Sequence, residues 1–161
     1  MIESVRIDQA GRADEQACLR IAASLPQFFT ADARSHMAED IQSHKTLVAR
    51  DGSDILGFIT SNSLSCVEHE ISWLAVRPDM HRKGIGRKLL ASLEAALVAG
   101  GGQELTVKTL AESAGYEPYH ATRAFYEANG FRLVKVVDPY PGWEAGNPCA
   151  IYAKTLEKHP G

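Results

Sequence analysis

The chain has 161 residues, of which 45% are hydrophobic and 23% charged, and its formal net charge is −3. This length suits one well-buried domain covering residues 1–161 and is short for two, and a net negative charge argues against binding nucleic acid through bulk electrostatic attraction. Three widely spaced cysteines predict neither a disulfide framework nor a zinc site, six histidines show no metal-binding spacing, and no apolar stretch approaches the roughly 20 residues of a membrane span. We therefore expect a cytoplasmic protein with no bound metal and no membrane contact.

The first half of the chain is expected to form a short strand, two helices and three further strands. Residues 4–7 alternate as a strand, and residues 13–25 carry an apolar repeat with a helical period that Pro26 breaks. The hydroxyl of Thr30 suits the N-cap of a second helix running to about Ser43. Strands are then expected at 44–50, 55–61 and 67–76, with Asp51-Gly52 as the hairpin turn between the first two.

The segment that follows these strands is the most informative part of the sequence. Pro78 stops the strand, because its ring fixes φ and removes an N–H, and an amphipathic helical pattern begins just after Gly86. The first N–H groups of such a helix lack intrahelical partners and lie at the positive end of its dipole, so they favour an anion. Gly84 and Gly86 allow a phosphate to approach the backbone closely. The predicted anion-binding segment is His81-Arg82-Lys83-Gly84-Ile85-Gly86-Arg87.

Two other phosphate-binding loops do not fit this segment. A Walker loop needs the pattern Gly-x-x-x-x-Gly-Lys-Ser/Thr, which the sequence lacks. A dinucleotide-binding fingerprint starting at Gly84 would need a glycine or alanine where Leu89 stands. The turn therefore predicts a pyrophosphate site of another kind.

The second half of the chain is expected to add one more helix and three strands. The glycine run at 100–102 ends the helix that follows the basic turn, and residues 104–109 read as the next strand. Pro118 suits the first turn of a late helix, and Gly130 suits the left-handed residue that ends it. Strands at 131–137 and 149–156 complete the sheet, with a Pro- and Gly-rich connection between them.

Two parts of the sequence, the anion-binding segment with its flanking strand and helix, and the late helix with its terminal glycine, resemble motifs of the GNAT acyltransferase superfamily. Residues 74–90 follow the family's pyrophosphate-binding motif, with His81 in place of the usual Gln or Arg, and residues 125–131 are similar to its late helix, Phe-Tyr-x-x-x-Gly-Phe. Tyr119 stands where many relatives have an asparagine that contacts the cofactor. The resemblance covers most of the chain and implies a mixed α/β (α+β) fold. Its sheet would have six to seven mostly antiparallel strands, splayed in the middle and flanked by about four helices.

The resemblance also implies an activity, an N-acetyltransferase that moves an acetyl group from acetyl-CoA to an amine in a direct ternary complex. Coenzyme A would be held by the anion-binding segment, by the backbone of Leu74, Ala75 and Val76, and by Tyr126. The family pattern assigns the oxyanion donor to the Leu74 N–H, the general acid to Tyr126 and the general base to Glu70. Because four strand residues span roughly 13 Å, Glu70 is expected to act through a bridging water.

Alternatives stay open for these residues. Glu68 rivals Glu70 as the base, and Glu70 could instead be a solvated strand carboxylate. Period-2 alternation puts Glu70, Ser72 and Leu74 on one face unless a bulge intervenes. Tyr126 could be only an aromatic ring that closes the core. A GNAT-like module that binds acyl-CoA without turnover would carry the same cofactor motifs.

The acceptor is expected to be a small-molecule amine or a protein amine. In the family it is shaped by the first two helices and the late strand connection, which here carry Gln27-Phe28-Phe29 and Tyr140-Pro141-Gly142-Trp143-Glu144. Aromatic rings beside a carboxylate could receive a cationic amine, but core and loop packing would explain the same residues. A monomer and a homodimer are both compatible with the sequence.

Overall fold

The computed structural model of the chain describes residues 4–157, and within them seven strands form one mixed sheet. The strands are β1 (Arg6–Gln9), β2 (Lys45–Asp51), β3 (Asp54–Ser63), β4 (Glu68–Val76), β5 (Glu104–Leu110), β6 (Arg132–Val137) and β7 (Cys149–Thr155). Their order is β1-β2-β3-β4-β5-β7-β6, and every neighbouring pair except β4 and β5 is antiparallel. The helices are α1 (Glu15–Ala23), α2 (Ala31–Ser43), α3 (Ile85–Ala99) and α4 (Tyr119–Ala128), with short 3-10 turns η2 (Arg12–Asp14), η3 (Pro78–Met80) and η4 (Glu112–Ala114). The predicted fold class is confirmed.

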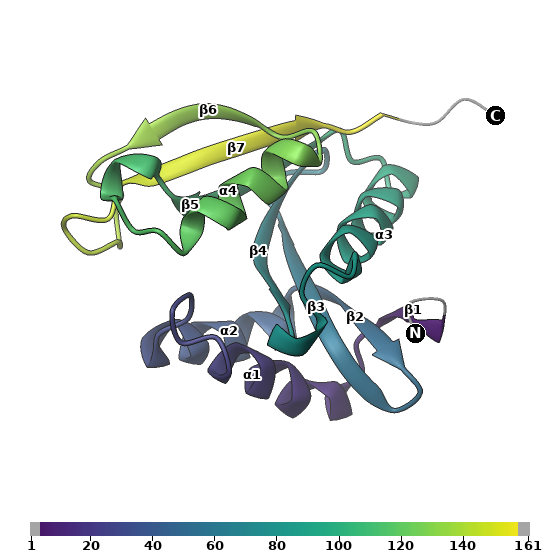
Figure 1. Cartoon of the computed structure of the whole chain (residues 1–161). Helices are drawn as coiled ribbons and strands as arrows, with labels where there is room; N and C mark the ends of the chain where they lie inside the picture. The colour runs from purple at the N-terminus through teal and green to yellow at the C-terminus, as the bar shows by residue number, and fades with distance from the viewer. Residues whose placement is uncertain (1–3, 158–161) are drawn as a thin grey trace.

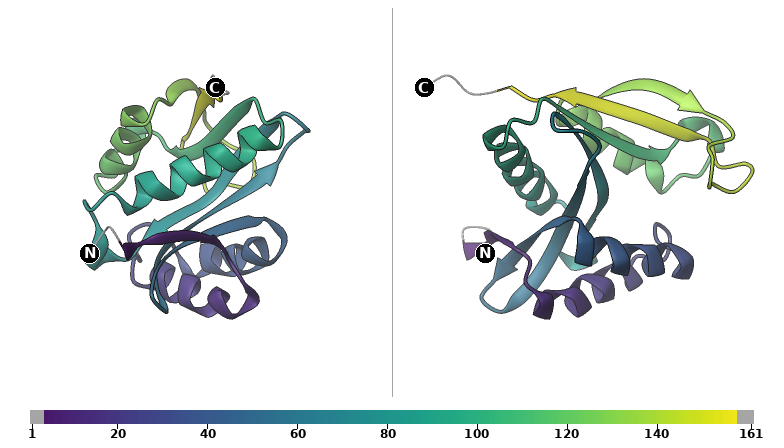
Figure 2. Two further views of the ribbon diagram at one scale, coloured as in Figure 1. Left: turned by 90° about the vertical axis from the view of Figure 1, so that its right-hand side faces the viewer. Right: turned by 180° about the vertical axis from the view of Figure 1, so that it is seen from behind.

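Helices cover both faces of the sheet (Figure 1). α3 packs on β2, β3 and β4, and the larger apolar core on that side also includes Tyr126 of α4. α1 covers the opposite face, with α2 beside it, and a second core around Met37 and Phe58 lies beneath them. Figure 2 shows that β5, β6, β7 and α4 form one half of the molecule, with β4 leading across to the other half.

Local signals placed most elements correctly, with small shifts at their ends. The Ala33 N–H donates to the Thr30 side chain at 3.1 Å, so the predicted N-cap of α2 is confirmed. Gly130 has φ of +92° after α4, also as predicted. The first strand begins at Arg6, two residues later than expected, because it pairs with β2 through Arg6↔Arg50.

A β-bulge at Ser72 changes which side chains of β4 face each core. The β3–β4 ladder skips Ser72, which has no partner residue on β3. Ile71 and Leu74 both contact the α3-side core, although strict alternation would place residues three apart on opposite faces, and Trp73 packs on the α1 side. The expected alternation from Glu70 onward therefore ends at this bulge.

The sheet is splayed between its two parallel strands (Figure 1). β4 and β5 pair from Glu68↔Glu104 to Ile71↔Val107 and then separate. Within the described chain, the rest of β4, through Val76, pairs only with β3. No strand satisfies the backbone groups on this open edge, so those that no side chain engages are free to bind a ligand.

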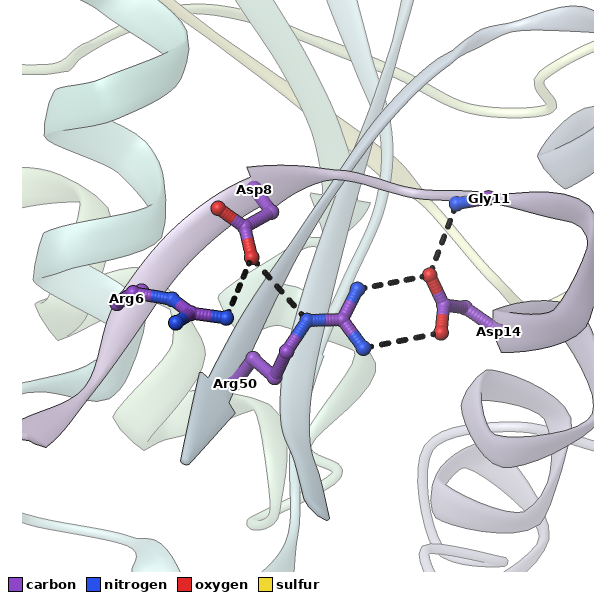
Figure 3. Close-up of polar contacts among 5 residues, drawn as sticks. All are labelled: Arg6, Asp8, Gly11, Asp14 and Arg50. Carbon is purple, nitrogen blue, oxygen red and sulfur yellow. Dashed lines mark hydrogen bonds and ion pairs between the residues drawn. The ribbon is translucent and has the colours of Figure 1, made fainter. Parts of the chain in front are cut away.

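Arg50 ties the first strand and the first helix to the sheet (Figure 3). Its Nε donates to Asp8 at 3.1 Å, and its two terminal nitrogens donate to both oxygens of Asp14 at 3.2 and 2.9 Å. The Gly11 N–H also donates to Asp14, at 2.8 Å. The Arg50 hydrogen bond lowers the pKa of Asp14, although burial acts in the opposite direction.

We expect Asp14→Asn to lower the free energy of unfolding by about 1–2 kcal/mol at pH 7, because a charge-assisted bidentate contact is lost. The stabilisation by Asp14 is present above its ordinary pKa of 3.8 and is lost as the pH falls through the lower folded-state value. Urea denaturation at pH 7 and pH 3 should therefore show a difference that shrinks in acid. Asp32→Asn, at an exposed position paired only with His36, is the control. An equal loss at both pH values would contradict the assignment.

A buried hydroxyl offers a second stability test. Thr60 is fully buried, and its Oγ1 has no hydrogen-bond partner in the described structure. Thr60→Val, which keeps the shape and removes the hydroxyl, should raise the free energy of unfolding by about 1 kcal/mol. Thr46 is also buried, at 5% exposed, but donates to the Ile41 and His44 carbonyls at 3.4 and 3.3 Å, so Thr46→Val should destabilise. Chemical denaturation that gave both variants the same sign would refute this explanation.

Candidate active site

The turn between β4 and α3 presents a row of backbone N–H groups. Gly84 is the N-cap of α3, and in the described chain no side chain caps this helix. The first intrahelical bond runs from the Lys88 N–H to the Gly84 carbonyl at 3.0 Å, so the preceding N–H groups of the helix remain free. Arg82 and Gly84 have φ of +64° and +82°, and left-handed residues of this kind curve the backbone into the concave shape that is typical of anion-binding turns.

The two glycines of this turn serve different purposes. Gly84 needs its left-handed φ, while a Cβ there would meet no atom within 4 Å. Gly86 lies in the first turn of α3, where a Cβ would come within 3.3 Å of the Phe125 ring of α4. Gly86 therefore permits close packing of α3 against α4, a purpose that the spacing of the motif did not indicate.

The side chain of His81 holds the turn to the end of β4. Its Nε2 lies 2.7 Å from the Val76 carbonyl oxygen, so the Nε2–H tautomer donates a hydrogen bond there. Arg82, Lys83 and Arg87 are exposed around the turn. His81, Arg82 and Arg87 line the adjoining cleft and Lys83 lies outside its lining.

A cleft of about 1490 Å³ connects the turn with the splayed strands. Its walls come from the α1–α2 loop, β4, the start of α3, β5 and α4. Arg77 N–H donates to the Leu56 carbonyl of β3, so by alternation the N–H groups of Leu74 and Val76 point to the open edge. Ala75 lines the cleft, but the same alternation turns its N–H and carbonyl toward β3. The Val76 carbonyl accepts from His81, so of these two residues only Leu74 also has a free carbonyl.

Tyr126 lies in the wall formed by α4. Its ring packs edge-on against Phe125 and Phe131, with centroids 5.2 and 5.3 Å away, and the residue is 4% exposed. Burial raises the pKa of Tyr126 above its ordinary value of 10.0, so the hydroxyl stays protonated at neutral and moderately alkaline pH. A protonated hydroxyl at this position can donate a hydrogen bond into the cleft.

Glu70 also lines the cleft, whereas its rival Glu68 is exposed outside it. Glu70 Oε2 lies 2.7 Å from the Lys108 ammonium of β5, with the two side chains 17% and 30% exposed. Burial alone would lower the pKa of Lys108, but the hydrogen bonds with Glu70 and Tyr140 raise it, so this lysine stays charged. Lys108 also lies 5.2 Å from the centre of the Tyr140 ring, which packs against Trp143. The late connection thereby reaches the predicted base.

Two tyrosines join the α1–α2 loop to the segment around the start of α4. Tyr116 donates to the Gln27 carbonyl at 2.8 Å, and Tyr119 donates to the Phe28 carbonyl at 3.0 Å. The rings of Tyr119 and Phe28 also make an edge-on contact at 5.2 Å. Tyr119 therefore shapes the wall of the cleft through the loop.

The sequence analysis did not predict that three polar residues come together in the wall of the cleft. Asp40 and His44 lie at the end of α2, and Ser72 occupies the β4 bulge. His44 Nδ1 lies 2.9 Å from the Ser72 hydroxyl, and Trp73 Nε1 donates to Asp40 at 2.7 Å. The spacing of Asp40 and His44 on one helix was a visible signal, but their contact with β4 required the fold.

Comparison with known proteins agrees with this geometry. An acetyltransferase (GNAT) domain model matches residues 42–133. A GNAT-family protein from Desulfovibrio desulfuricans superposes with a TM-score of 0.85 at 24% identity, covering 95% of this chain and 99% of the other. The ribosomal-protein-S18-alanine N-acetyltransferase of Escherichia coli gives 0.75 at 21%, covering 97% and 96%. An aminoglycoside 6'-N-acetyltransferase complexed with coenzyme A gives 0.74 at 20%, covering 97% and 99%. No match was found among curated protein sequences.

A splayed mixed sheet with an anion-binding helix start beside the gap defines an acyltransferase fold. The family model matches more than half of the chain, so the protein belongs to the GNAT acetyltransferase family. Between residues 4 and 157, no helix is long and apolar enough to cross a membrane, and no cluster of three or more potential metal ligands occurs.

Proposed function

We propose that the protein transfers the acetyl group of acetyl-CoA to an amine in a direct ternary complex. The observation that carries this proposal is the row of free N–H groups at the start of α3, which opens onto the gap between β4 and β5. Acetyl-CoA would supply the thioester whose acetyl group is transferred. Its diphosphate fits the N–H groups between His81 and Arg87, and an amide-rich arm fits the free edge of β4 at Leu74 and Val76.

Three residues of the protein would carry out the chemical steps of the transfer. The Leu74 N–H would stabilise negative charge on the thioester oxygen, because it is a fixed donor on the open edge. Tyr126 would act as the general acid by donating its hydroxyl hydrogen to the leaving sulfur. Complete transfer of that proton is unfavourable, because the tyrosine pKa is raised while an ordinary thiol titrates near 8.5. Glu70 would attract a cationic amine and accept its proton through water, with Oε2 already paired to Lys108.

The acceptor class is an amine. Two structural neighbours are named for their acceptors, which are a ribosomal-protein alanine and an aminoglycoside. In this chain, the acceptor side of the cleft combines the aromatic residues Phe28, Phe29 and Trp73 with the carboxylates of Asp40 and Glu70. Such a lining suits an amine that has an apolar body and a cationic head.

Calorimetry with acetyl-CoA, followed by an acylation screen over small amines and peptides, tests the proposal. We expect micromolar or tighter binding of acetyl-CoA and release of free thiol with at least one amine. Absence of acetyl-CoA binding would refute the cofactor site. Binding without transfer to any amine would instead support a module that holds acyl-CoA without turnover.

A further inference from the structure

The wall of the cleft contains three hydrogen-bonded polar side chains to which no part in proton transfer has been assigned. Ser72 Oγ lies 2.9 Å from His44 Nδ1, and His44 Nε2 lies 3.6 Å from Asp40 Oδ1. The other oxygen of Asp40 accepts a 2.7 Å hydrogen bond from Trp73 Nε1. All four residues line the cleft.

The fold holds these hydrogen-bonded side chains in place. The bulge at Ser72 lets this residue and Trp73, which follow one another in β4, both reach α2. The backbone N–H of His44 donates to the Asp40 carbonyl at 2.6 Å as α2 ends. The side chains of His44 and Asp40 are only 20% and 29% exposed, so neither is a freely rotating surface group.

The hydrogen bonds among these side chains favour proton transfer in one direction, from Ser72 to His44. A carboxylate beside Nε2 favours the tautomer that carries its proton there, and this leaves Nδ1 to accept from the Ser72 hydroxyl. If His44 gains a proton, the imidazolium lies next to the Asp40 carboxylate and at the C-terminal end of α2, where the helix dipole favours a positive charge. In this tautomer the Ser72 hydroxyl donates to Nδ1, so a proton entering at the serine would pass to the histidine.

Ser72 and Glu70 differ in their distance along β4 from Leu74. Ser72 is two residues before Leu74 and Glu70 is four, so the strand rise separates them from the oxyanion donor by roughly 7 Å and roughly 13 Å. Glu70 is moreover paired with Lys108 at 2.7 Å. Measured along β4, Ser72 is therefore nearer to the Leu74 N–H than Glu70 is.

We propose, on the basis of the proposed function, that Ser72 and His44 form a second and shorter proton route from the acceptor ammonium. One N–H bond of the ammonium breaks as its proton moves to Ser72 Oγ, while the original hydroxyl proton of Ser72 moves to His44 Nδ1. The amine is left neutral and His44 becomes an imidazolium paired with Asp40. Ser72 is the residue that touches the substrate, and His44 and Asp40 act through it. The charged groups around the route are Asp40 on α2 and Glu70, with its Lys108 partner, on β4 and β5.

Two probe amines separate a proton route from a structural contact. 2-Phenylethylamine, like lysine, is almost fully protonated at pH 7 and must lose a proton, whereas hydroxylamine is largely neutral at that pH. With the full-length chain and acetyl-CoA, Ser72→Ala and His44→Asn should lower kcat/KM for 2-phenylethylamine about 100-fold at pH 7. The same variants should change kcat/KM for hydroxylamine less than about threefold, because no ammonium proton has to be removed. The loss with 2-phenylethylamine should shrink as the pH rises toward 10.

The controls come from the same elements. His36→Asn alters the other histidine–aspartate pair of α2, His36 and Asp32, which is exposed and should leave both rates unchanged. Glu70→Gln should lower the rate with 2-phenylethylamine less than Ser72→Ala does. Calorimetry should find the same acetyl-CoA affinity in every variant.

Equal losses with both amines would overturn the proposal, because they would assign a purely structural role to the contact. Unchanged rates in Ser72→Ala would overturn it as well. If the unmodified chain binds acetyl-CoA but acetylates neither amine, the proposed activity on free amines fails, and this inference fails with it.

Discussion

Replacing Tyr126 with phenylalanine should lower kcat roughly 100-fold, the range expected for loss of one proton donor. The phenylalanine ring keeps the edge-on contacts with Phe125 and Phe131, so only the hydroxyl is lost. The affinity for acetyl-CoA should change less than about threefold, because the proposed diphosphate contacts lie at the start of α3. Steady-state kinetics with an amine found by the acylation screen, together with calorimetry, measure both quantities.

The dependence of activity on pH gives a second test of the role of Tyr126. Burial raises its pKa above 10.0, so the unmodified enzyme should show no loss of activity from this residue between pH 7 and that value. Tyr152→Phe is the matched control, since Tyr152 is buried in the same core but lies outside the lining of the cleft. A Tyr126→Phe variant with full kcat would remove Tyr126 from the chemistry and leave it a packing residue.

Replacing Gly84 with alanine should weaken acetyl-CoA binding about tenfold. An alanine at φ of +82° is strained by roughly 1–2 kcal/mol. The exposed turn can relax in the free protein, and binding would have to restore the strained shape. A cost of this size corresponds to about a tenfold change in dissociation constant. Calorimetry with acetyl-CoA provides the measurement.

Gly52→Ala is the control for Gly84→Ala. Gly52 has φ of +61° in the β2–β3 hairpin, and a Cβ there would also meet no atom within 4 Å. The backbone strain is therefore similar, but the hairpin lies away from the cleft. We expect Gly52→Ala to lower stability without changing acetyl-CoA affinity. Equal loss of affinity in both variants would show that the effect comes from general destabilisation.

The two tyrosines at the start of α4 change how the family resemblance applies to this chain. Where many relatives have a cofactor-contacting asparagine, Tyr119 donates to the Phe28 carbonyl of the α1–α2 loop, and Tyr116 does the same to Gln27. Burial raises the pKa of Tyr119, so this donor is not lost at physiological pH. At this position the tyrosine therefore shapes the wall of the cleft through the α1–α2 loop.

Local sequence patterns determined the elements and the anion-binding turn. Pro78, the glycines at 84 and 86 and the apolar helical repeat act over a few residues, so they could be read without knowing the fold. The same holds for Thr30 and Gly130, whose roles follow from the geometry of helix ends. The mostly antiparallel sheet was predicted through the resemblance of two motifs to the GNAT superfamily, because the order of the elements alone does not fix how the strands pair.

Only the tertiary structure decided how the wall of the cleft is arranged. Ser72 meets His44 across 28 residues of sequence, and Tyr119 meets Phe28 across 91. The bulge at Ser72 reverses the faces of β4, and no local pattern fixes a bulge to one residue, because it depends on the register with β3. The pairing of Glu70 with Lys108 likewise follows from the way β4 and β5 meet before they separate. Short-range sterics and helix-end electrostatics depend only on neighbouring residues, so the sequence determines them directly. Side-chain contacts between distant strands and helices exist only after the sheet has formed.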